Sequence, residues 1–288
     1  MEHRAWATLL RLKHRWKEHD NNDSAAAISF WALVSLIPLL YLGITVAGFF
    51  LGDSVAHGEL EKQLTEVMGP NVAANINRIM NQAGSLPKNN AFFLTIILFA
   101  LAFAGSHMLA KLRLSLNVIN GVDAHHPTRP LLGRLFARGL SALLILIFGG
   151  LLVISTVLDG LFLHFAEAWN PRIIERWQVI QGYDTISSAV LLIISFALVL
   201  KVLPRKRPLW RHVWPGALVS GIMVSSLKWV FGSYLQKSFL ASVLGTGLTT
   251  LILLFWILLS IKAFLLGAEI TSMLTENAEE EHKEFWAP

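Results

Sequence analysis

The sequence predicts an all-α polytopic membrane protein with six transmembrane helices and amphipathic helices at the membrane surface. Hydrophobic residues make up 54% of the 288-residue chain, whereas charged residues make up only 15%. Soluble domains carry about 25% charged residues. The apolar residues also collect in long runs, and the basic residues collect in alternate connections between those runs. These observations predict a membrane protein.

Six apolar runs have about the length that a membrane span requires. A helix needs roughly 20 residues to cross a hydrocarbon core of about 30 Å. The third and fourth runs are the most uniformly apolar, while the fifth contains Lys228 and several serines. The predicted spans are residues 25–51, 91–110, 140–158, 185–203, 213–235 and 248–274, within a transmembrane domain over residues 25–275.

The distribution of lysine and arginine predicts the orientation. Sixteen of the 24 basic residues lie in the N-terminal arm, the second and fourth connections and the C-terminal tail, and six lie in the other connections. Lysine and arginine concentrate in the cytoplasmic segments of membrane proteins. We therefore expect both termini to be cytoplasmic.

Three segments outside the spans have patterns of their own. Residues 1–24 place tryptophan and leucine among five basic residues, which is typical of a helix at the cytoplasmic membrane surface; a helix packed on the bundle is the alternative. Asp23 or Ser24 is expected to cap the first span. Residues 57–83 predict two outer-loop helices. Residues 276–288 predict a solvated acidic tail in the cytoplasm.

Charged residues inside the apolar runs give the strongest functional signal. A lysine near mid-depth costs at least about 2.5 kcal/mol on insertion scales, so it should face the bundle interior, water or an anionic group. Lys228 and Lys262 are therefore candidates for a cavity that holds an anionic ligand, with a structural ion pair or snorkelling as the alternative. Glu269 is a third candidate, although its place near the cytoplasmic end favours bridging basic residues.

Other polar features accompany these charges. His107 is a candidate for the same cavity and for proton relay, while a hydrogen bond to a neighbouring helix is the commoner use of such a histidine. Pro38 should kink the first span and free a carbonyl for Ser35 or a neighbouring helix. A polar helix end after the second span is expected to form a cytoplasmic cluster of Lys111, Arg113, Asn117 and Asn120.

Catalytic and metal-binding patterns are absent from the sequence. The lack of cysteine excludes disulfides, thiolate zinc sites and cysteine nucleophiles. Asp123, His125 and His126 lack the spacing of metal ligands. The chain has neither a P-loop nor a G-x-S-x-G nucleophile motif. We therefore expect no enzymatic activity, no catalytic residue, no metal and no cofactor.

Several short patterns occur in an order that resembles the YihY/BrkB family of bacterial inner-membrane proteins. They are AAAISFWALVSLIPLL at 25–40, the helix end around Asn117, WPGA at 214–217, the segment LASVLGTGLTTLILLFWILLS at 240–260 and GAE at 267–269. The similarity covers roughly residues 20–275. It implies six helices and an inner-membrane location. Trp214, Pro215 and Gly267 match recurring family patterns and, with Pro38, are candidates for gating or packing.

The resemblance also implies a role in envelope maintenance. Family members are linked to envelope integrity and serum resistance, and transport of lipid or lipopolysaccharide precursors has been proposed for some. Our leading hypothesis is a transporter or flippase-like protein for an anionic lipid or amphiphile, and a non-transporting scaffold is the second. The older family label of ribonuclease BN ranks third, because little soluble mass is left for an RNA site. The expected partners are anionic membrane lipids, with a periplasmic envelope protein as a candidate and no nucleic acid; the oligomeric state is left open.

Overall fold

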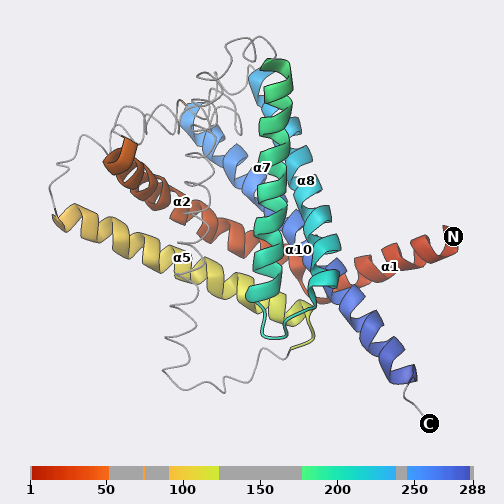
Figure 1. The fold of residues 1–288 in the computed structure, drawn as a ribbon. Coiled ribbons are helices and arrows are strands. Elements are labelled where there is room, and N and C mark those ends of the chain that lie inside the picture. Colours follow the sequence, from red (N-terminus) through yellow and green to blue (C-terminus); the bar gives the residue numbers. More distant parts are fainter. Residues whose placement is uncertain (1, 52–73, 75–90, 123–176, 238–244, 286–288) are drawn as a thin grey trace. The chain divides into compact units, whose positions relative to one another are not determined.

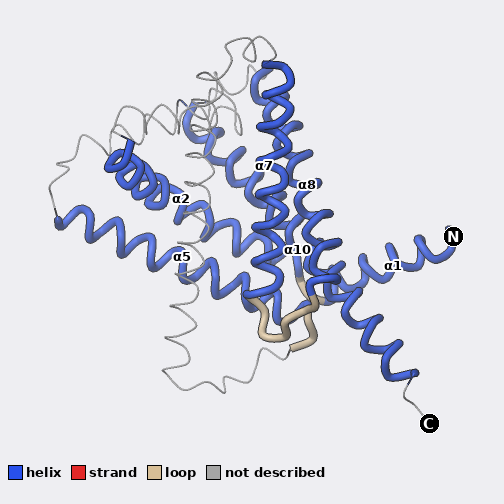
Figure 2. The backbone as a smooth tube through the Cα atoms, viewed as in Figure 1, coloured by secondary structure: helices blue, strands red, loops and turns tan. Residues whose placement is uncertain are grey.

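The structure is a computed structural model that describes residues 2–51, 74, 91–122, 177–237 and 245–285. Within these residues all regular secondary structure is helical, which confirms the predicted class for this part of the chain (Figure 2). The predicted third span at 140–158 and, apart from residue 74, the outer-loop helices at 57–83 lie outside the described residues.

Four of the other five predicted spans lie wholly within described helices, and the span 185–203 ends one residue beyond α7; each of the five helices is longer than its span (Figure 1). The apolar run stops at the first polar residues, whereas backbone hydrogen bonding continues through them. The helices are α1 (Glu2–Glu18), α2 (Asn21–Leu51), α5 (Ala91–Ile119), α7 (Trp177–Val202), α8 (Trp210–Lys237) and α10 (Gly245–Phe285).

Two segments of the described helices are long and apolar enough to cross a membrane. They are Thr95–Ile119 in α5 and Thr250–Glu280 in α10, and Ala189–Val202 in α7 is a shorter apolar segment. The number of six spans therefore stays a prediction.

The chain divides into two compact units, one formed by Met1–His126 with Phe196–Pro288 and the other by Pro127–Ser195. The second unit is described only over residues 177–195, which form the first part of α7. The first unit contains the other described helices and the end of α7. The contacts among α1, α2, α5, α8 and α10 lie within this unit.

Helices α8 and α10 share the most extensive packing in the first unit. Gly216 and Gly267 lie backbone to backbone at their crossing, so that a β-carbon on either residue would overlap the other's carbonyl oxygen. Nearby, Ser220 Oγ lies 3.2 Å from the Ala263 carbonyl oxygen, to which it donates. Phe231 contacts Phe255 at a ring distance of 6.2 Å. Residue numbers rise in one helix as they fall in the other, so the two helices run antiparallel.

The start of α2 differs from the expected cap. Asp20 adopts a φ of 48° and ends α1 in the left-handed region, which aspartate tolerates better than most residues. Helix α2 then begins at Asn21, and the amide of Ser24 donates to the Asp20 carbonyl at 3.0 Å. The prediction that Asp23 or Ser24 caps this helix was wrong, because both lie inside its first turn.

The acidic C-terminal segment predicted as a solvated tail is helical, since α10 continues through it to Phe285. Asn277, Glu279 and Glu280 are exposed. Glu276, Asn277 and Glu279 contact basic side chains of other segments. These partners are remote in sequence, and they stabilise a helix that the local charge pattern does not indicate.

Pro38 lies inside α2, and the helix continues past it to Leu51. The carbonyl that Pro38 frees is that of Val34, and Ser35 or a neighbouring helix was expected to satisfy it. The Ser35 hydroxyl instead donates to the Ala32 carbonyl at 3.0 Å, so the first alternative was wrong. The second alternative stays a prediction.

Candidate functional site

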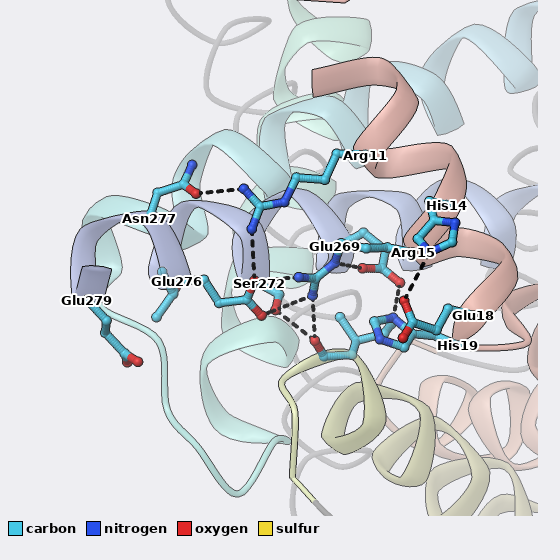
Figure 3. A network of polar contacts seen from close by, with 12 residues as sticks. Arg11, His14, Arg15, Glu18, His19, Glu269, Ser272, Glu276, Asn277 and Glu279 are labelled. Carbon is cyan, nitrogen blue, oxygen red and sulfur yellow. Dashed lines mark hydrogen bonds and ion pairs between the residues drawn. The ribbon is translucent and has the colours of Figure 1, made fainter. Parts of the chain in front are cut away.

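Glu269 is a fully buried carboxylate near the C-terminal end of the apolar part of α10, with 0% of its side chain exposed. Three side chains surround it, from α1, from the turn after α1 and from the start of α2; Figure 3 labels the first two, Arg15 and His19. Arg15 Nε donates to Oε2 at 3.1 Å, Asn21 Nδ2 donates to Oε1 at 2.6 Å, and His19 Nδ1 lies 2.7 Å from Oε1. A buried carboxylate without such partners would be strongly destabilising.

Arg15 uses the rest of its guanidinium group to join three helices. Nη1 pairs with Glu276 of α10, and Nη2 donates to Ser272 Oγ at 2.9 Å and to the Ile119 carbonyl of α5 at 3.0 Å. Ser272 Oγ also donates to the Ile119 carbonyl at 2.7 Å. The planar guanidinium offers five donors in a fixed arrangement, and this network uses that geometry.

Helical spacing explains why these side chains meet. In α1 the half-buried face carries Leu12, Arg15 and Trp16, and His19 in the turn that follows continues the same spacing of three and four residues. In α10, Glu269, Ser272 and Glu276 follow at spacings of three and four. Residues at these spacings share one face of a helix. One face of α1 therefore meets one face of α10.

The environment of Arg15 favours its charged form. Burial lowers the pKa of Arg15, but the hydrogen bonds and charges of Glu276 and Glu269 outweigh this effect, so the pKa lies above the ordinary value for arginine. The guanidinium therefore keeps its charge at any physiological pH, and it holds both carboxylates in place.

Asn21 is a second fully buried polar residue at this point. Its Nδ2 atom donates to Glu269, while its Oδ1 atom has no hydrogen-bond partner among the described residues.

Within the described residues, no group of three or more histidine, aspartate or glutamate side chains is placed to hold a metal ion. The candidates Asp123, His125 and His126 lie outside the described residues. The Glu269 cluster is thus an ion-pair network.

Lys262 and Lys228 differ from Glu269 in having no polar partner among the described residues. Both side chains are half-buried. Lys262 precedes Gly267 by five residues, which places it roughly 140° around α10 from the face that contacts α8. The two lysines therefore do not meet across the contact between α8 and α10. The cavity predicted around them stays a prediction.

His107 belongs to an aromatic cluster on α2 and α5. Its ring is exposed, stacks on Trp31 at 4.6 Å and lies 4.5 Å from the ring of Phe103. Nδ1 lies 2.9 Å from the Phe103 carbonyl of its own helix. No contact joins His107 to Glu269 or to either lysine within the described residues.

The predicted cytoplasmic cluster separates into different roles. Asn117 is buried, and its Oδ1 atom accepts a hydrogen bond from the Arg205 amide at 2.8 Å, which joins α5 to the loop before α8. Asn120 Nδ2 donates to Leu116 in its own helix at 2.6 Å. Lys111 is exposed and Arg113 is half-buried.

The gating and packing candidates also separate. Gly267 contacts Gly216 at the closest point between α8 and α10. Pro215 lies inside α8, and Trp214 is 43% exposed on the same helix.

The sequence analysis did not identify four residues of the Glu269 network, which are Arg15, His19, Asn21 and Ser272. The spacing of four between Arg15 and His19 was visible, but nothing local connects that pair with Glu269.

Comparison with known proteins places the chain among bacterial membrane proteins. The model of a family described as Virulence factor BrkB matches residues 12–287. A UPF0761 membrane protein of Nitrosospira multiformis is 27% identical over 266 residues, which are 91% of this chain and 59% of the relative. One from Coxiella burnetii is 24% identical over 282 residues, 96% of each chain.

A UPF0761 membrane protein of Stenotrophomonas maltophilia shares 34% identity over 82 residues, which are 28% of this chain and 19% of the relative. The chain thus spans 59% of the length of the Nitrosospira relative and 96% of the Coxiella relative. No solved structure matches the chain.

Proposed function

Because the chain belongs to the Virulence factor BrkB family of UPF0761 membrane proteins, we propose that it moves an anionic lipid or other anionic amphiphile between membrane leaflets. It acts as a transporter or flippase-like protein of the bacterial inner membrane, with six spans and both termini in the cytoplasm. It serves envelope maintenance and catalyses no reaction.

The observation that supports this proposal is that Lys262 has no polar partner in the part of the chain that the structure describes. This lysine lies inside the apolar segment Thr250–Glu280 and is half-buried, without a hydrogen bond or ion pair among the described residues. A lysine in a span costs at least about 2.5 kcal/mol on insertion scales. An anionic group from outside the chain would offset this cost, and the headgroup of an anionic lipid that crosses between leaflets would supply one.

The contacts of Glu269 also support Lys262 as the residue that binds the anionic headgroup. Glu269 shares the face of α10 with Lys262, two helical turns away, but its oxygens are taken by Arg15, His19 and Asn21. Glu269 is therefore occupied, whereas Lys262 has no polar partner among the described residues. We assign the anionic headgroup to Lys262 and give Lys228 a secondary role on α8.

Lipid movement tests the proposal directly. The full chain is reconstituted in liposomes that contain headgroup-labelled phosphatidylglycerol, and transfer between leaflets is followed by quenching of the outer leaflet. Lys262→Met should slow transfer by about tenfold, because it removes a charge-assisted contact of about 1.5–3 kcal/mol. Lys262→Arg should retain transfer, and Lys228→Met should have a smaller effect.

The control is Lys13→Met, which removes one exposed positive charge from α1 and should leave transfer unchanged. No transfer by the unaltered protein would contradict the proposal, as would equal transfer by the protein and its Lys262→Met variant. The first outcome would favour the scaffold alternative, in which the charges only hold helices together.

A further inference from the structure

The loop before α8 and the first two turns of that helix carry exposed cations and large apolar side chains together. The exposed fractions are 59% for Leu209, 46% for Trp210 and 43% for Trp214. We call this the basic–aromatic surface. It consists of Arg205, Arg207, Leu209, Trp210, Arg211 and Trp214, all of them exposed.

Internal contacts hold this surface in one arrangement. The Arg205 amide donates to Asn117 of α5 at 2.8 Å. Lys201 Nζ donates to the Pro208 carbonyl at 2.6 Å and lies 5.7 Å from the centre of the Trp210 ring. Trp210 in turn lies 6.5 Å from Trp214. The connection, drawn in tan between α7 and α8 in Figure 2, is therefore pre-organised.

The guanidinium groups of the three arginines of this surface have no partner among the described residues. Two neighbouring lysines do: Lys201 contacts Pro208 and Trp210, and Lys206 pairs with Glu279 at 2.8 Å. No acidic side chain contacts Arg205, Arg207 or Arg211 among the described residues. Helix α8 also has no acidic residue in its first turn, and a cation there is unfavourable for the helix itself. The stability of the fold does not explain this charge.

The apolar side chains continue from this surface along α8. Trp210, Trp214, Leu218 and Ile222 are all exposed and follow one another at intervals of four residues, so they form one stripe on the helix. Tryptophan is enriched at the headgroup level of membranes, with aliphatic residues deeper and arginine toward the water. This order favours a bilayer surface over a soluble polyanion such as RNA.

We propose that the basic–aromatic surface docks on anionic phospholipid headgroups at the membrane surface. The guanidinium groups of Arg207 and Arg211 bind headgroup phosphates, to which their paired donors are suited. Trp210 and Trp214 anchor at the level of the headgroups. This site is separate from Lys262, and it does not depend on lipid transport.

The chain has no cysteine, which permits a single reporter. Leu209→Cys is labelled with an environment-sensitive dye, and the full-length protein is placed in phosphatidylcholine nanodiscs with increasing fractions of phosphatidylglycerol. The dye emission should shift to the blue as phosphatidylglycerol increases, and added salt should weaken the shift by screening. This measurement requires no substitution other than that of Leu209 and leaves the three arginines and two tryptophans of the surface in place.

Substitution of neighbouring residues then separates the docking charges from the paired one. Arg207→Gln and Arg211→Gln should each raise the half-maximal phosphatidylglycerol fraction about fivefold, the effect of one basic residue near an anionic surface. Lys206→Gln removes an adjacent charge that Glu279 already pairs, so its effect should stay below about twofold.

An emission that does not depend on phosphatidylglycerol would overturn the proposal. So would an equal effect of Lys206→Gln and Arg207→Gln. A shift of the same size with inorganic phosphate or RNA in pure phosphatidylcholine discs would also overturn it, because the surface would then bind a soluble anion. Since the reporter does not follow transport, a protein that is inactive in leaflet transfer can still give the expected result here.

Discussion

Arg15 and Glu269 lie 254 positions apart in the chain, yet Arg15 Nε donates to Glu269 Oε2 at 3.1 Å in a setting where the carboxylate is fully buried. This pair joins the N-terminal helix α1 to α10. The same guanidinium reaches Glu276 and the end of α5, so one side chain connects three helices. We expect this pair to be required for the packing of α1 against α10.

Removal of the Glu269 carboxylate should destabilise the protein strongly. Glu269→Ala should lower the free energy of unfolding by about 3–5 kcal/mol, because it leaves Arg15, His19 and Asn21 with unsatisfied groups in a buried place. Denaturant titration in detergent micelles measures this change. Glu280→Ala removes an exposed carboxylate of the same helix and should stay within about 0.5 kcal/mol.

A double-mutant cycle tests whether the effect belongs to the pair. Arg15→Ala and Glu269→Ala should be non-additive by about 1–3 kcal/mol, since each removes the same contact. Strictly additive losses would show that the two side chains act independently.

The contribution of Arg15 should not change between neutral and moderately alkaline pH. Its pKa in the folded protein is raised above the ordinary value for arginine, so its stabilising effect is complete below that ordinary value and is lost only as the pH rises through the folded pKa. The difference in unfolding temperature between the unaltered protein and Arg15→Gln should therefore be constant from about pH 7 to about pH 10. A difference that shrinks over this range would contradict the assigned charge state.

The close approach of α8 and α10 should depend on two glycines. Alanine normally improves a helix by about 1 kcal/mol over glycine. At Gly216 and Gly267 the added β-carbon meets the backbone of the other helix, so each change to alanine should instead destabilise by about 1–3 kcal/mol. A gain in stability from Gly216→Ala or Gly267→Ala would show that the helices are farther apart than described.

Asn117 should be needed to hold the loop before α8. Asn117→Ala leaves the Arg205 amide without its acceptor and should cost about 1–2 kcal/mol. Asn120→Ala is the matched control, because Asn120 donates only within its own helix, and it should stay within about 0.5 kcal/mol. Hydrogen exchange of the Arg205 amide reports directly on this hydrogen bond. Exchange should be faster in Asn117→Ala and unchanged in Asn120→Ala.

The sequence alone determined the helical class, the family and the positions of the described helices, because these depend on local properties. Hydropathy sums over about 20 neighbouring residues, and helical periodicity needs only a few turns. Lys262 was recognised in the same way, since a charge inside an apolar run is visible without any partner. The short ordered patterns around residues 25–40, 214–217 and 267–269 were enough to identify the family that the comparison confirms.

The tertiary structure decided which side chains meet. Glu269 was visible as a charge, but its partners Arg15 and His19 lie 254 and 250 positions away, and only the packing of α1 against α10 brings them together. The same reason explains the acidic segment after residue 276, where Arg15 and Lys206 stabilise a helix that local repulsion opposes. Local patterns set each helix and its faces, whereas the pairing of faces depends on contacts between residues far apart in the chain.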